Sequence, residues 1–282
     1  MLNALTIDVE DYFHTEAMTA AAPREQWDSM PSRVQASTES LLEILDRHRV
    51  KGTLFFLGWV ADRFPQLVAL AAKQGHEIGC HSYWHRAVFR LDVRSFREDT
   101  LRAKTAIENA GGKAVLGYRA PSFSITPGSE WAIEVLASLG FQYDSSVNPI
   151  RHAFYGNAGA SRTPYRREGG IWELPIATIR GFGQNLPCGG GAYLRLFPQK
   201  YFHLALRRLA KEGVPANFYL HPWEVDPDQP RLACGWKSAF RQYTGLRGTA
   251  DKLSSLLAAY RFGPIRDAYS SLFTADAVRA GA

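Results

Sequence analysis

The sequence predicts an α/β fold, a distorted (β/α)7-type barrel of parallel strands followed by a C-terminal extension. Short runs of β-branched or aromatic residues alternate with segments whose apolar residues recur at helical spacing, which is the pattern of consecutive βαβ units. The chain has 282 residues and is 46% hydrophobic. This length and composition are sufficient for a single α/β barrel with a full core.

The strand candidates are short apolar segments bounded by turn residues. They lie at 4–9, 53–57, 77–81, 115–119, 141–145, 171–177 and 216–221. Apolar residues at helical spacing predict helices at 38–49, 64–74, 92–110, 128–139, 198–212 and 249–261. Glycine, the residue that commonly ends a helix, follows four of these segments at Gly75, Gly111-Gly112, Gly140 and Gly213.

Three stretches have no clear periodicity and are predicted to be irregular, namely 146–170, 181–191 and 222–248. We expect the first to contact substrate, because long loops inside a compact domain are commonly functional. We divide the chain into a barrel at 1–224 and an extension at 225–282 that packs on the barrel.

The net charge of +6 is compatible with nucleic acid, an anionic glycan or a membrane that carries an anionic lipid-linked substrate. The basic residues are dispersed and no nucleic-acid-binding module is recognisable, so we expect a glycan partner and no nucleic acid. A peripheral contact with the inner membrane through a lipid-linked substrate is left open here, as is the oligomeric state.

The chain opens into an apolar run without a basic leader, and no apolar segment has the length of a membrane span. The cysteines Cys80, Cys188 and Cys234 are odd in number and far apart, which argues against a disulfide framework and fits a reducing compartment. We therefore predict a cytoplasmic protein, with Cys80 as a small buried apolar residue.

Polar residues cluster where the predicted strands end. In chain order they are Asp8, Glu10 and Asp11 at the end of the first strand, His81 and His85 after the third, Arg119 at the end of the fourth, Asp144 at the end of the fifth, and His221 at the end of the seventh. In a parallel barrel these strand ends converge on one rim, where active sites form. The scattered positions are therefore expected to make one pocket.

His81 and His85 are the candidate metal ligands. If the chain turns helically there, the four-residue spacing lets both rings meet one ion. Two histidines and one carboxylate leave open positions for water and substrate, as a catalytic metal needs. An isolated H-x-x-x-H also arises by chance on surface helices, so the other rim residues carry part of the argument.

Five motifs then allow a comparison with known families. They are Thr6-Ile7-Asp8-Val9-Glu10-Asp11, His81-Ser82-Tyr83-Trp84-His85, Arg119-Ala120-Pro121-Ser122-Phe123, Tyr143-Asp144-Ser145-Ser146 and Leu220-His221-Pro222-Trp223-Glu224. With them the chain resembles the polysaccharide deacetylases of the NodB-homology type, carbohydrate esterase family 4, and within these the exopolysaccharide-locus branch found with exosortase systems. The resemblance spans residues 4–224 and continues into the segment after Trp223.

This resemblance implies a metal-dependent hydrolase that removes acetyl groups from N-acetylhexosamine units of an exopolysaccharide or its precursor. By resemblance, Asp8 is the general base and His221 the general acid to the departing amine. Arg119 would orient Asp8 and keep it ionised. Asp144 would hold an imidazole, that of His221, in one tautomer. A backbone N–H in the loop after Arg119, together with the metal, would bind the oxyanion.

The first motif departs from the common family pattern, in which two adjacent Asp residues serve as base and metal ligand, because a Val and a Glu intervene before Asp11. Strand alternation puts Asp8 and Glu10 on one face, whereas Asp11 has the shorter side chain more usual in this role. Either Glu10 or Asp11 is therefore expected to complete the metal site with His81 and His85.

Nitrogen and oxygen donors with open positions suit Zn²⁺, and Co²⁺, Ni²⁺ or Fe²⁺ would also fit. Trp84 and Phe123 are expected to form walls against a sugar ring. The alternative hypothesis is a catalytically inactive carbohydrate-binding or assembly protein on the same fold. The sugar, the linkage and the choice between N- and O-deacetylation are left open.

Overall fold

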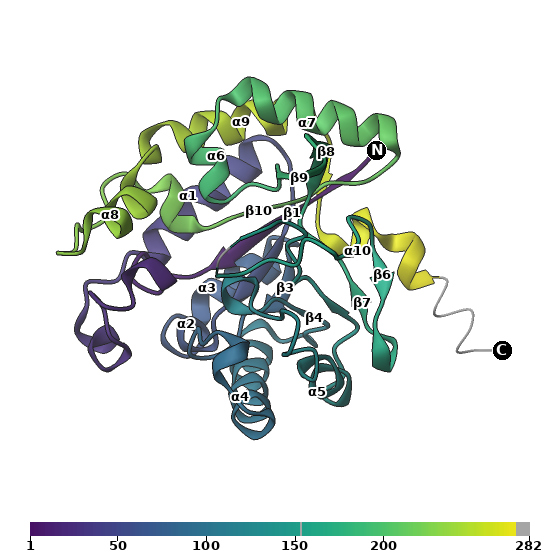
Figure 1. Ribbon diagram of the computed structural model, residues 1–282. Helices are drawn as coiled ribbons and strands as arrows, with labels where there is room; N and C mark the ends of the chain where they lie inside the picture. Colours follow the sequence, from purple (N-terminus) through teal and green to yellow (C-terminus); the bar gives the residue numbers. More distant parts are fainter. Residues whose placement is uncertain (153, 275–282) are drawn as a thin grey trace.

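The structure is a computed structural model that describes residues 1–152 and 154–274. Its centre is a mostly parallel sheet curled into a half-barrel, with helices packed around it (Figure 1). Within the described residues the strand order is β10-β1-β2-β3-β4-β5-β7-β6, and β11 pairs with the start of β1. The strands are β1 (Asn3–Val9), β2 (Thr53–Phe56), β3 (Glu77–Cys80), β4 (Gly117–Tyr118), β5 (Tyr143–Asp144), β6 (Tyr165–Arg166), β7 (Trp172–Glu173), β10 (Asn217–Leu220) and β11 (Phe262–Gly263).

Seven predicted strands correspond to β1–β5, β7 and β10, which are all parallel to their neighbours in this run. The predicted α/β fold, a distorted (β/α)7-type barrel of parallel strands, is thus confirmed, with the sheet curled into a half-barrel (Figure 1). At the open side, the Asn217 amide on β10 donates to the carbonyl of Leu174 just after β7 (2.8 Å), and the N–H of Ala177 donates to the carbonyl of Asn217 (3.0 Å). These bonds bring the two ends of the sheet together.

The helices pack around the sheet (Figure 1). They are α1 (Val34–Arg47), α2 (Gly58–Arg63), α3 (Pro65–Lys73), α4 (Val93–Gly111), α5 (Ala132–Ser138), α6 (Ala192–Leu196), α7 (Gln199–Glu212), α8 (Trp236–Tyr243), α9 (Thr249–Ala259) and α10 (Ile265–Ala268). Short 3-10 turns occupy Glu16–Met18, Arg24–Ser29, Val88–Arg90, Pro121–Phe123, Glu168–Gly170, Pro222–Val225 and Leu246–Gly248. The six predicted helices correspond to α1, α3, α4, α5, α7 and α9.

Local chemistry explains the limits of the longest helix, α4. The Asp92 carboxylate accepts the N–H of Ser95 (2.7 Å) at its start, which satisfies one of the unpaired donors of the first turn. At its end Gly112 has φ +66°, a left-handed conformation that glycine adopts without a side-chain penalty. The apolar face between these limits packs against α2, α3 and α5.

The stretches predicted to be irregular contain some regular structure. β8 (Thr178–Gly181) and β9 (Gln184–Pro187) form a separate antiparallel hairpin, and the two-residue strand β6 adds to β7. Helix α8 lies within 222–248, where we expected none. Its apolar residues Trp236, Ala239, Phe240 and Tyr243 do recur at helical spacing. Trp236 and Phe240 are nevertheless exposed, and the only buried side chain of α8 is that of Gln242.

Strand β1 shows how the sheet separates core from site. All seven of its residues are buried. Leu5, Ile7 and Val9 belong to the main apolar core under the helices, while Thr6 and Asp8 point to the other face, where they contact Arg119. The period of two along a strand therefore puts one face in the core and polar groups inside the half-barrel.

The C-terminal segment packs against the amino ends of the strands. β11 pairs with β1, Ile265 is fully buried, and its N–H donates to the Thr53 hydroxyl of β2 (2.8 Å). Helix α9 contacts α1, α6 and α7. The boundary that we placed at residue 224 stays a prediction, and residues 275–282 of the extension lie outside the described residues.

All three cysteines are free, and Cys80 is fully buried as expected. None of the helices among the described residues has both the length and the apolar character needed to cross a membrane. The cytoplasmic location stays a prediction.

Candidate active site

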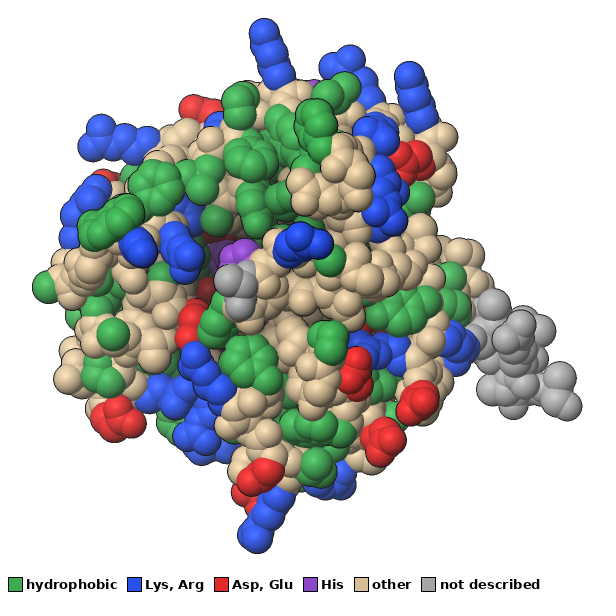
Figure 2. All heavy atoms as spheres, in the orientation of Figure 1, with side chains coloured by type: hydrophobic (Ala, Val, Ile, Leu, Met, Phe, Trp, Pro, Cys, Tyr) green, Lys and Arg blue, Asp and Glu red, His purple; other side chains and the backbone are tan. Residues whose placement is uncertain are grey.

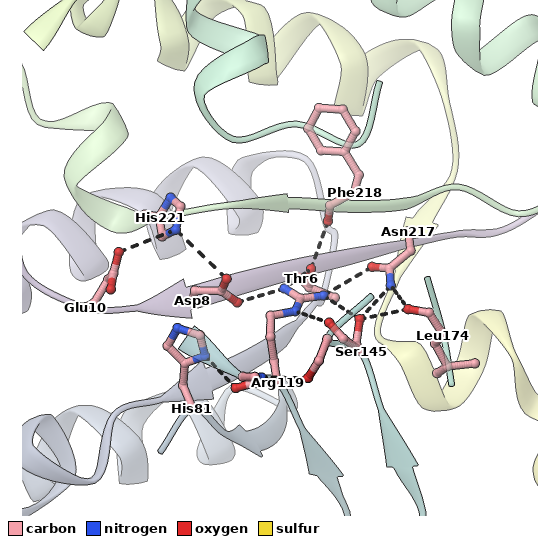
Figure 3. Close-up of polar contacts among 12 residues, drawn as sticks. Thr6, Asp8, Glu10, His81, Arg119, Ser145, Leu174, Asn217, Phe218 and His221 are labelled. Atoms are coloured by element: carbon pink, nitrogen blue, oxygen red, sulfur yellow. Dashed lines mark hydrogen bonds and ion pairs between the residues drawn. The ribbon is translucent and has the colours of Figure 1, made fainter. Parts of the chain in front are cut away.

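Most of the polar residues predicted at the strand ends lie together at the carboxyl ends of β1, β3, β4 and β10 (Figure 3). Asp8 belongs to β1, and Glu10 directly follows this strand. His81 follows β3, Arg119 follows β4, and His221 follows β10. Parallel strands that share one direction deliver all of these side chains to the same rim.

Glu10, His81 and His85 form a candidate metal-binding triad. Each offers one ligand atom, and these atoms all lie within 4.8 Å of one another. All three side chains are buried, with exposed fractions of 2%, 2% and 8% for the whole residues. Two imidazole nitrogens and one carboxylate oxygen match the ligand set of a catalytic metal site with open positions.

The tautomer of His81 is set by a neighbouring carbonyl. Its Nδ1 lies 2.8 Å from the carbonyl oxygen of Arg119, so Nδ1 carries the proton and donates, which leaves the Nε2 lone pair free for a metal. Burial lowers the pKa of His81 to about 4. The ring is therefore neutral at physiological pH, as a ligand must be.

The histidine loop is not helical, and our expectation of a helical turn there is wrong. Ser82 and His85 have φ values of +63° and +50°, an uncommon left-handed conformation for residues other than glycine. The Asp99 carboxylate of α4 holds this loop by accepting the N–H groups of Tyr83 (2.8 Å) and Trp84 (3.2 Å). Strained backbone, rather than helical spacing, brings the two rings together with centroids 5.3 Å apart.

The Glu10 carboxylate fits a cation. Its Oε1 accepts the indole N–H of Trp223 (3.2 Å). Its Oε2 lies 2.8 Å from His85 Nε2, yet this buried oxygen has no aligned hydrogen-bond donor. Two electron-rich atoms that face the same point without a hydrogen bond are suited to ligate one ion. Burial opposes ionisation of Glu10, but the neighbouring imidazoles of His85 and His221 lower its pKa well below the ordinary value.

Asp11, the other carboxylate considered for this site, has a structural role instead. Its Oδ2 accepts the Ser32 hydroxyl (2.6 Å) and the N–H groups of Arg33 (2.9 Å) and Val34 (3.1 Å), while Oδ1 accepts the N–H of Tyr12 (2.9 Å). Asp11 thus caps the start of α1, and the triad does not contain it. The structure favours Glu10 of the two alternatives.

Asp8 and Arg119 form a buried ion pair next to the triad. The Arg119 guanidinium donates to Asp8 Oδ1 (2.7 Å) and to the Thr6 hydroxyl (2.7 Å), and it also bonds the carbonyl and the hydroxyl of Ser145. Arg119 is fully buried and lies over the Phe55 ring at 4.5 Å. With its donors fixed, the guanidinium holds Asp8 in one orientation.

His221 is held by a carboxylate that we did not predict for this role. Its Nδ1 lies 3.0 Å from Glu224 Oε2, and Glu224 Oε1 in turn accepts from the Arg195 guanidinium (2.8 Å). The other ring nitrogen, Nε2, lies 3.4 Å from Glu10 Oε1 and 3.9 Å from Asp8 Oδ2. Burial opposes protonation, but the carboxylates of Glu10 and Glu224 raise the pKa of His221 to about 9.

Asp144 does not contact His221, so the tautomer role that we expected of it is wrong. It ends β5 and accepts the hydroxyl proton of Ser146, and Ser146 Oγ accepts the N–H of Ala120 (2.8 Å). Asp144 therefore supports, through Ser146, the backbone that follows Arg119. The oxyanion role of that backbone stays a prediction.

Two family models match adjacent parts of this chain. Residues 26–143 match the model described as polysaccharide deacetylase, and residues 145–270 match the model described as a domain of unknown function, DUF3473. Both matches fall on the half-barrel that carries the site. The chain therefore contains a polysaccharide deacetylase domain joined to a DUF3473 region.

Curated relatives are deacetylases of several glycans. The chain is 32% identical over 98 residues to the peptidoglycan-N-acetylglucosamine deacetylase of Bacillus cereus, over 34% of this chain and 36% of the relative. It is 28% identical over 149 residues to the peptidoglycan deacetylase of Helicobacter pylori, over 52% and 49%. It is 29% identical over 101 residues to the chitooligosaccharide deacetylase of a Bradyrhizobium strain, over 36% and 44%. The aligned part spans half or less of these relatives.

Solved structures show the same fold at low sequence identity. A crystal structure from Mycobacterium smegmatis, of a protein classed with the polysaccharide deacetylases, is similar with a TM-score of 0.65 and 21% identity, and covers 97% of this chain and 90% of that one. A family 4 carbohydrate esterase from Streptomyces lividans, in complex with acetate, is similar with a TM-score of 0.50 and 17% identity, over 93% and 91%. Both show that this chain has the polysaccharide deacetylase fold.

The site of this polysaccharide deacetylase domain opens into a cleft of about 630 Å³ lined by Asp8, Glu10, His81, His85 and His221. This volume lies in the range of small-molecule sites. Figure 2 shows a hollow on this face with a histidine side chain inside it and basic side chains at its edge.

Of the two aromatic walls that we expected, one lies in this cleft. Phe123 lines it and packs edge-on against Tyr219, with centroids 4.9 Å apart. Trp84 is not among the residues that line the cleft, because its ring packs against Tyr83 and Trp27. Our expectation that Trp84 forms a wall is wrong.

The site also depends on residues that the sequence analysis missed. Glu224 lies three residues after His221, and this spacing in a helical turn was a usable signal, since residues three apart share a face. Arg195 had no such signal, because it lies on α6 in the DUF3473 region, between the stretch predicted to be irregular at 181–191 and the helix predicted at 198–212.

Proposed function

We propose that this protein is a metal-dependent hydrolase that removes acetyl groups from N-acetylhexosamine units of an exopolysaccharide or its precursor. The observation that carries the proposal is that three kinds of functional group lie together at the carboxyl ends of the parallel strands. The Glu10–His81–His85 triad lies beside a buried Asp8–Arg119 pair and beside His221. Together they supply a metal site, a base and an acid, which amide hydrolysis requires.

In this proposal Asp8 takes the proton from the attacking water. Its Oδ1 is engaged by Arg119, while Oδ2 faces His221 and is available on the cleft side. The buried guanidinium supplies the counter-charge of this carboxylate and fixes its orientation. A divalent ion at the triad would polarise the amide carbonyl and make water more acidic.

His221 then gives a proton to the departing amine. A pKa raised to about 9 by the carboxylates of Glu10 and Glu224, against the effect of burial, keeps the imidazolium populated at neutral pH. Glu224 fixes the ring through Nδ1, so Nε2 carries the transferable proton. Water and the acetamide thus become acetate and a free amine, with one proton taken by Asp8 and one delivered by His221.

The proposed substrate class rests on the relatives and on the cleft. The curated relatives are named for N-acetylglucosamine in peptidoglycan and for chitooligosaccharides. The cleft is large enough for more than a single small ligand group, and Phe123 and Tyr155 give it apolar walls, which suit the faces of sugar rings. We further propose that the substrate is an exopolysaccharide, that the protein belongs to the exosortase-locus branch, and that it acts in the cytoplasm.

We propose Zn²⁺ as the metal. Two neutral imidazoles and a carboxylate are typical zinc ligands in catalytic sites. Co²⁺, Ni²⁺ or Fe²⁺ would bind the same donors, so the metal is to be identified by elemental analysis of the purified protein.

The experiment offers N-acetylated chitooligosaccharides to the zinc-loaded protein and measures acetate and free primary amine together. We expect both products in equal amounts, and we expect neither with the Asp8→Asn variant. An O-acetylated xylooligosaccharide in a parallel reaction distinguishes ester from amide hydrolysis. Acetate from the ester alone would overturn the assignment to N-deacetylation, and no product from any acetylated glycan would overturn the enzyme proposal.

A further inference from the structure

Among the described residues, the Arg241 guanidinium at the edge of the cleft has no ion-pair partner. Three arginines line the cleft, namely Arg90, Arg195 and Arg241. Arg195 is committed to Glu224 and to backbone carbonyls. Arg90 pairs with Glu16 (2.9 Å). Within residues 1–152 and 154–274, Arg241 has no carboxylate within ion-pair distance, and it is exposed on α8.

Arg241 nevertheless stands on a rigid base. The Arg195 guanidinium donates to the backbone carbonyl of Arg241 (2.6 Å) and to those of Gln242 (3.2 Å) and Thr244 (2.8 Å). The next side chain, Gln242, is buried and bonds the carbonyl of Tyr12 (3.0 Å) and the hydroxyl of Thr15 (3.0 Å). The last turn of α8 is therefore fixed over the cleft, so the Arg241 side chain projects from a defined position.

The surface that shares the cleft with Arg241 suits a sugar. His152 and Tyr155 line the same cleft, with their rings stacked at 3.8 Å and an interplanar angle of 20°. Burial lowers the pKa of His152 and the charge of Arg241 lowers it further, so this ring is neutral and its charge does not compete with that of Arg241. A flat stacked pair and an uncommitted guanidinium together form a place for a ring that carries a negative group.

From this arrangement we infer that Arg241 binds an acidic group on the glycan, a carboxylate or a phosphate, and so makes the cleft selective for anionic over neutral N-acetylated glycans. The inference deepens the proposed function and rests on it for the identity of the cleft as a glycan site. Guanidinium pairs with either group in a two-pronged geometry. The DUF3473 region would then contribute substrate selectivity, since Arg241 belongs to it.

The test measures binding directly, so that it does not depend on turnover. Calorimetry on the full-length, zinc-loaded Asp8→Asn protein compares a tetrasaccharide of alternating glucuronate and N-acetylglucosamine with chitotetraose of equal length. N-acetylglucosamine 1-phosphate in a third arm separates phosphate from carboxylate. The neutral counterpart of the acidic tetrasaccharide is chitotetraose, and that of N-acetylglucosamine 1-phosphate is N-acetylglucosamine. We expect one of the two anionic ligands to bind with a Kd about tenfold lower than its neutral counterpart.

Three further variants assign the effect to one side chain. Arg241→Gln is expected to abolish the anionic preference and to leave neutral binding unchanged, while Arg241→Lys retains part of the preference because it keeps the charge but loses the fork. Lys237→Gln removes an equal charge from the same helix outside the cleft, and it should change neither affinity. Because the pair is solvent-exposed, the preference should also fall as salt rises.

The outcomes separate this inference from the proposed function. Equal affinities for anionic and neutral ligands, or an equal effect of Lys237→Gln, would overturn the inference even if the wild-type enzyme releases acetate from chitotetraose. Anion-selective binding that Arg241→Gln abolishes would support it even if no acetate is released from any glycan.

Discussion

At the scale of single residues, the Asp8 carboxylate divides its two oxygens between two partners. Arg119 binds Oδ1 at 2.7 Å, and Oδ2 lies 3.9 Å from His221 Nε2. Among the described residues, Asp8 is the only carboxylate that forms an ion pair with Arg119. This pairing places a compensating positive charge beside a buried carboxylate and fixes its orientation.

Replacing this base tests its role. Asp8→Asn is expected to lower kcat by about 10²–10⁴-fold, the usual contribution of a general base, while the bound metal stays at one ion per chain. The asparagine side chain has nearly the same shape as that of aspartate. Steady-state kinetics measures the loss of kcat, and elemental analysis measures the metal content of the same variant. Loss of the metal along with activity would instead place Asp8 among the ligands.

The Glu224 carboxylate tunes the acid. His221 donates a proton only while it is protonated, so activity falls as pH rises through the pKa of His221, which Glu10 and Glu224 raise to about 9 against burial. In Glu224→Gln one of these charges is absent, so the alkaline limb of the pH profile of kcat is expected at lower pH. The control is Glu212→Gln, an ion-paired residue on α7. An unchanged alkaline limb would show that Glu224 does not act on the acid.

At the scale of elements, the observed strands and longer helices agree closely with the predicted ones, because each of these segments has a clear apolar periodicity and residues that end it. Helix α8 was missed although its apolar residues recur at helical spacing, because it has only eight residues, fewer than the window over which such periodicity is recognised. The histidine loop was misread for a different reason. Its two rings converge through left-handed residues held by Asp99 of α4, a contact across 16 residues that spacing does not encode.

The start of α1 distinguishes the two carboxylates that follow β1. Asp11→Ala removes the acceptor for three hydrogen bonds at this helix start, so it should lower the free energy of unfolding by about 2 kcal/mol. Metal content should not change. Chemical denaturation measures the loss, with Glu43→Ala on the exposed side of α1 as the matched control. Loss of metal at unchanged stability would return Asp11 to the ligand set.

At the scale of the whole molecule, the site combines both matched regions with the strand that precedes them. His81, His85 and Arg119 lie in the region matched to polysaccharide deacetylase, and Asp8 and Glu10 lie before it. The remaining residues, His221, Glu224 and Arg195, come from the DUF3473 region. Sequence motifs were sufficient to place most of these side chains on one rim. The motifs could not predict the Arg195–Glu224–His221 chain, because it depends on a tertiary contact between α6 and the turn after β10.

Arg195 holds this second half of the site together. In Arg195→Met, Glu224, which is 1% exposed, keeps only His221 as a cationic partner. The removal of one partner from a buried ion pair costs up to about 3–5 kcal/mol. We expect a lower unfolding midpoint in urea and a looser α8, seen as faster amide exchange at 236–244. Arg247→Met, on the surface nearby, is the control. Wild-type stability of Arg195→Met would contradict a bridging role.

The most direct test of the central claim titrates metal-depleted protein with Zn²⁺ and measures acetate released from an N-acetylated chitooligosaccharide. Chelation should abolish acetate release without unfolding the chain, and activity should return in proportion to added Zn²⁺ until one ion is bound per chain. Glu10→Gln and His85→Ala should neither bind that ion tightly nor recover. Acetate release that persists in the metal-depleted protein, or full recovery by both variants, would contradict the metal site described for this chain.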